Sequence, residues 1–292
     1  MSIRNNDERT GARQSDEAPA AVATPPSSTP ESNQPVGLSF VVPTEFVEIP
    51  SRGKYYPENH PLHNQTTIEI RHMTAKEEDI LTSRTLLKKG LAIDRMLQNI
   101  IVDKKIKPDS LIIGDKNAII VSARSSAYGS DYTTRVTCPA CGAIGEHSFD
   151  LQHVKYIHPD DNETDEFTQT DNGTFILTLP VTNVSVEVRL LTGKDEAWLA
   201  KMSENKKKHK LGESMLTDQM RLFIASINGV TNKGQINGFI DAMPARDSRY
   251  LRNTYNKVVP NVDLTQEFGC ESCGEESQME VPFTTDFFWP KS

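Results

Sequence analysis

Residues 68–81 are Ile68-Glu69-Ile70-Arg71-His72-Met73-Thr74-Ala75-Lys76-Glu77-Glu78-Asp79-Ile80-Leu81, and residues 186–199 are Val186-Glu187-Val188-Arg189-Leu190-Leu191-Thr192-Gly193-Lys194-Asp195-Glu196-Ala197-Trp198-Leu199. The same order of apolar, acidic, apolar and basic residues, followed by Thr, Lys, an acid and Glu, recurs 118 positions later (186 − 68). The alternation predicts a strand, and Thr with an acid three residues later predicts the start of a helix. We therefore expect two copies of one structural unit.

The four cysteines of the chain also fall into two copies. Cys138 and Cys141 form one Cys-x-x-Cys-Gly knuckle, and Cys270 and Cys273 form the other. Such knuckles between polar, alternating strands are typical of a structural zinc ribbon. The knuckles are 128 residues apart (270 − 141 − 1), far more than in an ordinary ribbon. We expect a pseudo-twofold axis between the units to join both hairpins at one Zn²⁺ site of four thiolates.

Other uses of the four cysteines fit less well. Disulfides are expected in secreted proteins, and the chain shows no secretory signal. A redox Cys-x-x-Cys normally stands alone at a strand-to-helix turn. An iron–sulfur cluster also uses four cysteines and stays open as a minor alternative. Because four thiolates already complete a tetrahedral site, His147, His153 and His158 are expected at the surface and not as ligands.

The sequence predicts an α+β fold built from an internally duplicated strand–helices–hairpin unit. Unit one is expected over residues 40–151 and unit two over 172–284, joined by an acidic linker over 152–171. Residues 1–39 are rich in Pro, Ser, Thr and charge, so we expect a disordered arm. Residues 285–292 form an aromatic C-terminal tail.

Local signals place the individual elements. Asp115 is interpreted as the N-cap of a helix that ends near Ala127. Apolar spacing from Leu216 to Ile227 predicts a helix that Gly229 ends. The further expected elements are strands over 67–71, 132–137, 146–151, 264–268 and 278–283, a hairpin of 175–180 with 184–189, and helices over 74–83, 90–103, 236–242 and 244–258.

Charge and composition restrict the partners. The net charge is −8, which disfavours duplex nucleic acid as the main partner. The one basic run, residues 206–210, is interpreted as a solvated helix end or loop, with a patch for nucleic acid or an anionic partner as the alternative. No membrane span and no signal peptide are evident, so we expect a soluble protein made in a cytoplasm. The common catalytic motifs are not present either, so we expect a non-enzymatic protein.

Two segments are candidates for contacts with a partner. Pro50 precedes Ile68 by 18 residues, whereas Pro180 precedes Val186 by six, so unit one carries twelve extra residues. This insertion is either a contact surface or a tolerated surface loop. The aromatic tail is either a partner anchor or packs back on unit two. The candidate residues are Arg52, Gly53, Lys54, Tyr55 and Tyr56 in the insertion, and Phe287, Phe288 and Trp289 in the tail.

Residues 46–57, which include Arg52-Gly53-Lys54, together with residues 68–81 resemble the T4-type bacteriophage baseplate family, whose members are baseplate hub proteins or hub assembly chaperones. The resemblance is clear over about 40–150 and weaker in unit two. It implies a non-enzymatic role in tail assembly, in the host cytoplasm and in the virion baseplate if the protein is retained. The implied partners are hub, tape-measure or wedge subunits. A zinc-ribbon adaptor for nucleic acid or transcription is the alternative function.

Overall fold

The computed structural model describes residues 41–152, 154–159, 166–209, 214–282 and 285–288. The disordered arm expected over residues 1–39 lies outside them, and so does Trp289. From Val42 onward the described chain belongs to one compact unit of mixed helices and strands. None of the described helices has the length and apolar character needed to cross a membrane.

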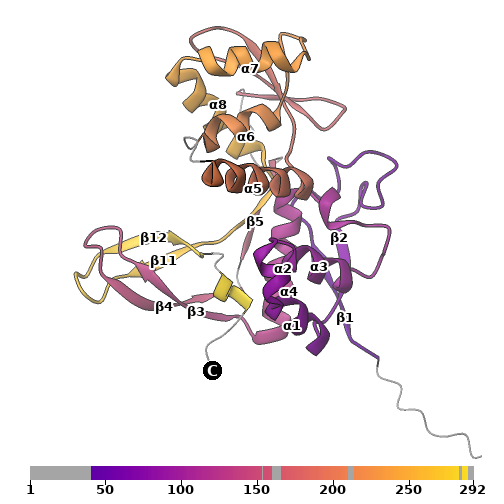
Figure 1. Ribbon diagram of the computed structural model, residues 1–292, viewed down its shortest axis with the longest axis vertical. Helices are drawn as coiled ribbons and strands as arrows, with labels where there is room; N and C mark the ends of the chain where they lie inside the picture. Colours follow the sequence, from indigo (N-terminus) through magenta and orange to yellow (C-terminus); the bar gives the residue numbers. More distant parts are fainter. Residues whose placement is uncertain (1–40, 153, 160–165, 210–213, 283–284, 289–292) are drawn as a thin grey trace, which may run out of the picture. The chain divides into compact units, whose positions relative to one another are not determined.

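The first half begins with an antiparallel pair of strands, β1 (Thr44–Glu48) and β2 (Thr67–Arg71). Thr74 and Glu77 then form the predicted capping box at the start of the first helix. The carboxylate of Glu77 also forms an ion pair with Arg71 at 2.6 Å, which connects the start of the helix to the end of β2. The helices that follow are α1 (Ala75–Thr82), α2 (Arg84–Lys88), α3 (Ala92–Ile100), η1 (Pro108–Ser110) and α4 (Ile113–Tyr128) (Figure 1).

The second half begins with an antiparallel sheet in the order β6–β7–β8–β9. Thr192 and Asp195 form a capping box, and the carboxylate of Asp195 forms an ion pair with Arg189 at 2.7 Å. The strands of this sheet are β6 (Thr168–Gln169), β7 (Phe175–Thr178), β8 (Ser185–Val188) and β9 (Ile224–Ile227), and the helices are α5 (Gly193–Lys208), α6 (Met215–Phe223), α7 (Lys233–Ala242) and α8 (Ala245–Val258).

Each half ends in a strand hairpin. One hairpin is β3 (Asp131–Thr137) with β4 (Ile144–Asp150), and the other is β11 (Thr265–Gly269) with β12 (Glu276–Glu280). The 3-10 turn η3 (Thr285–Phe288) follows β12. Figure 1 shows the two hairpins side by side and extending away from the helices.

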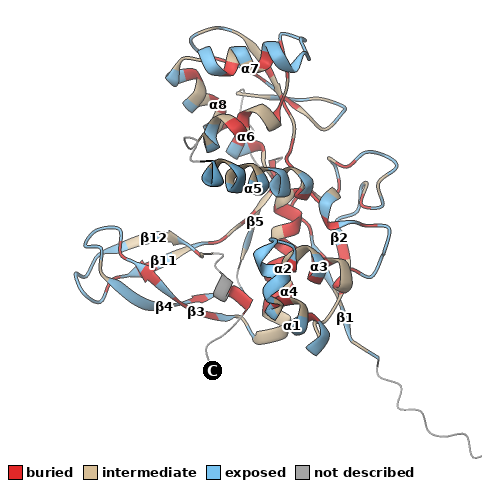
Figure 2. Ribbon diagram, viewed as in Figure 1, coloured by how far each residue is buried: buried red, intermediate tan, exposed pale blue. Residues whose placement is uncertain are grey.

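The halves share backbone contacts and one hydrophobic core. The short strand β5 (Lys155–Ile157) pairs with β10 (Asn261–Asp263). Gly114 lies so close to the other half that a Cβ there would come 1.9 Å from the carbonyl oxygen of Pro260. A single cluster of buried residues runs through both halves, and α5 is exposed over most of its length (Figure 2).

Three local expectations are wrong. His158 was expected at the surface, but it is buried, and its Nδ1 lies 2.8 Å from the carbonyl oxygen of Pro50. His153, which was expected at the surface too, lies outside the described residues. Asp115 is not an N-cap, because α4 begins at Ile113 and places Asp115 in the third helical position. The helix expected from Leu216 to Ile227 ends at Phe223, and residues 224–227 form β9 because they pair with β8. Edge pairing within the sheet thus overrides the helical spacing of the apolar residues.

Candidate metal centre

The turn of each hairpin is a knuckle closed by backbone hydrogen bonds. The N–H of Cys138 donates to the carbonyl oxygen of Ala143 at 2.9 Å, and the N–H of Gly142 donates to that of Cys138 at 3.0 Å. Cys270 and Gly274 make the equivalent bonds in the other hairpin. Both glycines have positive φ angles, +73° and +72°, a conformation that glycine adopts without strain. The turn thereby directs both sulfurs of a knuckle to one side.

The two hairpins contact each other along their strands. The side chain of Gln266 accepts from the N–H of Asp150 at 3.0 Å and donates to its carbonyl oxygen at 2.5 Å. The ring of His147 packs against Phe149 at 4.7 Å and against Phe268 at 5.2 Å. His147 is therefore a packing residue between the hairpins and lies outside the cysteine cluster.

The four sulfurs form a cluster with the dimensions of a tetrahedral metal site. The ligand atoms of Cys138, Cys141, Cys270 and Cys273 all lie within 4.8 Å of one another. Two separations, Cys138 to Cys273 and Cys141 to Cys270, are 3.8 Å. A tetrahedron with metal–sulfur distances of about 2.3 Å has edges of about 3.8 Å, so the donor set fits zinc. The prediction that the distant knuckles meet at one site is confirmed.

The protonation of the cluster is asymmetric. Backbone N–H groups of Cys273 and Ser272 lower the pKa of the Cys270 thiol to about 7. The pKa of Cys273 is raised to about 12, because the sulfurs of Cys141 and Cys270 outweigh the favourable N–H group of Glu275. One thiolate is thus readily accommodated, and further thiolates at such short range require a cation to offset their repulsion.

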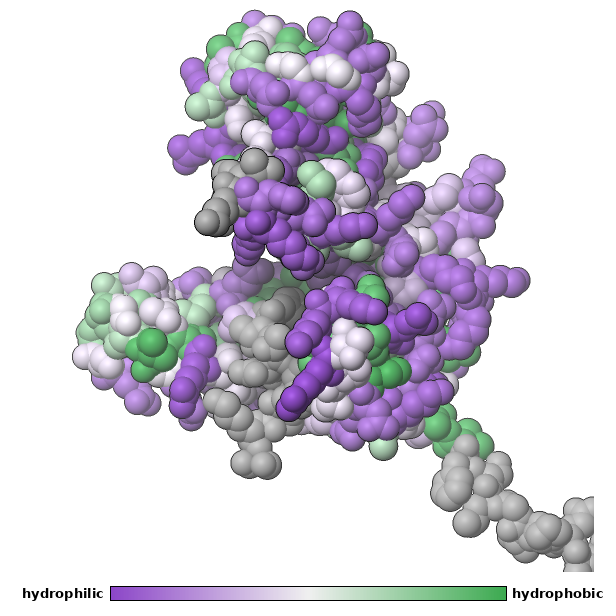
Figure 3. Space-filling model, viewed as in Figure 1, coloured by the Kyte–Doolittle hydropathy of each residue, from purple (hydrophilic) through white to green (hydrophobic). Residues whose placement is uncertain are grey.

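The surroundings of the cluster are acidic. The segment 265–280, which forms β11, the second knuckle and β12, contains five Glu residues and no Lys or Arg. In the other hairpin Arg135 lies 3.8 Å from Glu146, and both side chains are exposed. Ile144, next to the first knuckle, is 72% exposed. Figure 3 shows hydrophobic surface at this far end of the hairpins.

The insertion of unit one folds against α4 and does not extend freely from the surface. Buried Asp115 accepts hydrogen bonds from the N–H and hydroxyl of Ser51 at 2.9 and 2.6 Å, and from the hydroxyl of Tyr56 at 2.7 Å. Burial raises the pKa of Asp115, and burial together with that carboxylate raises the pKa of Tyr56. Gly53 has φ +72°, and a Cβ there would lie 2.4 Å from backbone atoms, so only glycine fits.

The remaining residues of this insertion differ in exposure. Tyr55 is half-buried and packs its ring 5.5 Å from that of Phe175 in the second half. Arg52 is half-buried with φ +49°, and Lys54 is exposed. Tyr56 is 4% exposed, so it is a residue of the protein interior and not of a contact surface. The contact role expected for this insertion stays a prediction for its accessible members, Arg52 and Lys54.

The aromatic tail is not exposed at Phe287 and Phe288, which is a correction to the expected accessible tail. Their exposures are 1% and 3%. Phe287 packs edge-on against Tyr132 at 5.0 Å, and its carbonyl oxygen accepts from Arg124 at 2.7 Å. The described part of the tail, η3, therefore packs on α4 and β3 of the first half.

Comparison with known proteins gives one result. A family model described as T4 bacteriophage base plate protein matches residues 43–289. The match spans both capping boxes, the Arg-Gly-Lys insertion and all four cysteines. No curated protein and no solved structure matches the chain.

Proposed function

We propose that this chain, which belongs to the T4 bacteriophage base plate protein family, is a non-enzymatic baseplate hub component or hub assembly factor. The observation that carries the proposal is the family match over residues 43–289, which includes nearly the whole described fold. The protein would act through contacts with hub, tape-measure or wedge subunits, first in the host cytoplasm and then in the tail baseplate if it is retained.

Zinc would have a structural role in this protein. The four thiolates of Cys138, Cys141, Cys270 and Cys273 would hold Zn²⁺, and such a set leaves no open coordination position for substrate. The ion would join segments that are far apart in sequence and fix the hairpins as one rigid extension. An extension of this kind suits a scaffold whose surface must meet several neighbours.

We also propose that the fold arose by duplication and has a pseudo-twofold axis through the metal centre. Three repeated contacts support this. Arg71 with Glu77 and Arg189 with Asp195 have the same spacing of six residues. The first cysteine of each knuckle lies beside the second cysteine of the other. Asp247 occupies the third position of α8, as Asp115 does in α4.

The contacts of these two aspartates also correspond. Asp247 accepts from the N–H of Val181 at 2.8 Å and from the N–H and hydroxyl of Thr182 at 3.0 and 2.8 Å. Asp115 likewise accepts from the N–H and hydroxyl of Ser51. In each half, an aspartate near the start of a helix thus hydrogen-bonds the turn that follows a strand: α4 binds the turn after β1, and α8 binds the turn after β7.

The alternative of a nucleic-acid adaptor is weakened by charge. Five Glu residues lie beside the cysteines over residues 265–280, and phosphates would be repelled there. Within the basic run, Lys206 is paired with Asp218. Retention of the purified protein on DNA at low salt would revive this alternative.

A complementation experiment tests the proposed function. Phage that lack this gene are grown in cells that supply either the full chain or none. We expect baseplates to form only with the full chain, and the chain to co-sediment with baseplate proteins during assembly. Normal baseplates without the chain, together with no co-sedimentation, would contradict the proposal. Presence or absence in finished particles then separates a hub component from a factor that leaves.

A further inference from the structure

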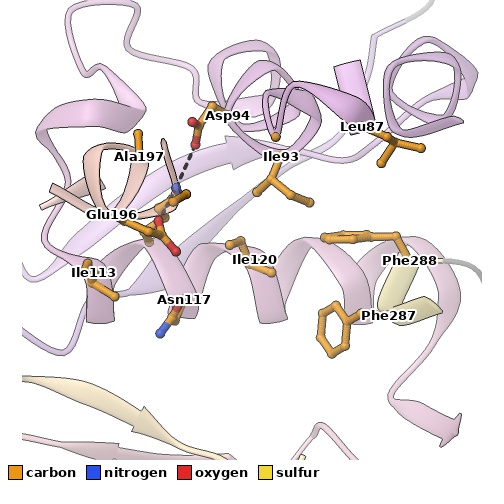
Figure 4. A pocket seen from close by; sticks show the side chains of 13 residues that line it. Leu87, Ile93, Asp94, Ile113, Asn117, Ile120, Glu196, Ala197, Phe287 and Phe288 are labelled. Carbon is orange, nitrogen blue, oxygen red and sulfur yellow. Dashed lines mark hydrogen bonds and ion pairs between the residues drawn. The ribbon is translucent and has the colours of Figure 1, made fainter. Parts of the chain in front are cut away.

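A groove of about 550 Å³ lies between α3, α4, α5 and η3 on the surface of the described fold. Its walls are mainly apolar, and Figure 4 shows side chains from α2 and α3 facing those of α4 and η3 across it. Leu87 is 40% exposed, so part of this apolar wall is in contact with solvent. The main apolar lining residues are Leu87, Ile93, Ile113, Ile120, Phe287 and Phe288.

One end of the groove carries a cluster of charges. Lys116 is 6% exposed, and its Nζ lies 2.7 Å from Asp94 Oδ1 and 2.7 Å from Glu196 Oε2. Figure 4 shows Asp94 and Glu196 at this end of the groove. Burial alone would lower the pKa of Lys116, but the two carboxylates outweigh it and raise that pKa. The cluster holds two negative charges against one positive charge. Because the Glu196 side chain is half exposed, it can accept a second cation.

The groove continues across α5. A neighbouring hollow of about 480 Å³ between α5 and α6 shares Glu196 and Ala200 with it. Leu199 and Met215 line this second hollow, and Met215 is 63% exposed. An elongated apolar surface with charge near its middle fits a polypeptide segment better than a compact small molecule.

We propose that this groove binds an amphipathic segment of another baseplate protein, with apolar side chains on one face and a Lys or Arg that meets Glu196. The inference rests on the proposed baseplate function and adds the binding surface and the chemistry of the partner. Burial of apolar side chains supplies most of the affinity. The basic residue sets the direction of the segment, since a partly exposed ion pair contributes little energy.

Site-specific photo-crosslinking in assembled baseplates tests the proposal. A photoreactive phenylalanine derivative replaces Ala197, which is exposed and lines the groove, or Asn205, an exposed α5 residue outside both hollows. We expect position 197 alone to crosslink to another baseplate protein, at a segment that combines apolar residues with Lys or Arg. Crosslinks only to this chain's own C-terminal residues or to a second copy, or no crosslink at position 197, would overturn it.

A binding measurement with the identified segment provides the quantitative test. The synthetic peptide is titrated against the full chain by fluorescence anisotropy. We expect Leu87→Asp to weaken binding at least tenfold by placing a charge in the apolar wall, Glu196→Gln about threefold, and Asn205→Asp, which adds the same charge outside both hollows, to leave it unchanged. Equal affinity for all variants would refute the proposal that the segment binds in this groove. If the chain does not sediment with baseplates at all, the proposed function itself fails; if it sediments but position 197 is silent, only this inference fails.

Discussion

Loss of one metal ligand should release the two hairpins from each other. Cys141 and Cys273 are the exposed members of the cluster, so Cys141→Ser or Cys273→Ser removes a ligand without opening a cavity in the core. Cys138 and Cys270 are buried and are left in place. The zinc-loaded full chain should therefore lose stability mainly through loss of the metal link.

The size of the effect follows from the chain length that the metal closes. Cys138 and Cys270 are 132 residues apart (270 − 138). If the metal link is treated as a crosslink, the chain-entropy relation for a loop of that length gives about 5 kcal/mol at 25 °C. With a urea m-value of about 2–3 kcal/mol/M, the midpoint of unfolding should fall by roughly 2 M.

Urea unfolding with metal analysis on the same sample checks this prediction. We expect one zinc per monomeric chain, and a chelator should shift the wild-type midpoint as far as Cys141→Ser does. The chelator should have no further effect on the variant. The reasoning is refuted if the purified chain carries no zinc and four free thiols, if a dimer carries half a zinc per chain, or if all midpoints coincide.

Further substitutions test the remaining parts of the fold. Asp115→Ala leaves buried donors without an acceptor and should lower the free energy of unfolding in urea by about 3 kcal/mol. Asp247→Ala should lower it by a similar amount. A loss below about 1 kcal/mol for both variants would contradict the shared role. Gly53→Ala should cost more than about 2 kcal/mol, because its Cβ would overlap backbone, whereas Gly129→Ala, with φ +85° in open space, should cost about 1 kcal/mol. Burial alone would raise the pKa of Glu77, but hydrogen bonds lower it from 4.5 to about 2. Its contribution of about 3 kcal/mol is therefore complete above pH 4.5 and is lost as the pH falls toward 2; Glu77→Gln should flatten that decline in acid unfolding, and an unchanged profile would refute it.

Features set by neighbouring residues could be predicted from the sequence. Thr74 with Glu77 and Thr192 with Asp195 start helices where expected, because a capping box is formed within one helical turn. The geometry of each knuckle also depends on neighbouring residues alone, because the two residues between its cysteines form a turn that determines where both sulfurs point. Their meeting at one site could be expected only because the pattern occurs twice.

Features set by distant residues were missed. Asp115 looked like a cap, yet its carboxylate binds Ser51, which lies 64 positions earlier. Ile224 looked helical, yet it pairs with Val188 in the sheet. Phe287 has no neighbour in sequence that would indicate its packing against Tyr132. Position in the chain alone suggested an accessible tail, whereas the residues that bury it come from the opposite half.

The spacing between matching residues shows where the proposed copies diverged. The offset is 118 from Arg71 to Arg189 and 132 from Asp115 to Asp247, so the second half has fourteen more residues between these points than the first (132 − 118). The structure accounts for much of this difference, because α5 has 16 residues where α1 has 8.

Contacts needed by both copies should persist in both, as the two ion pairs and the two buried aspartates do. The added length of α5 has no counterpart in the first half, so the shared scaffold does not require it. α5 is also the helix that separates the two hollows and supplies Glu196 to both. The added length of α5, residues 201–208, contributes Ser203, Glu204, Lys206 and Lys207 to the second hollow, whereas Glu196 lies in the part of α5 that matches α1. The extra turns of α5 therefore enlarge the proposed binding surface on the side of α6.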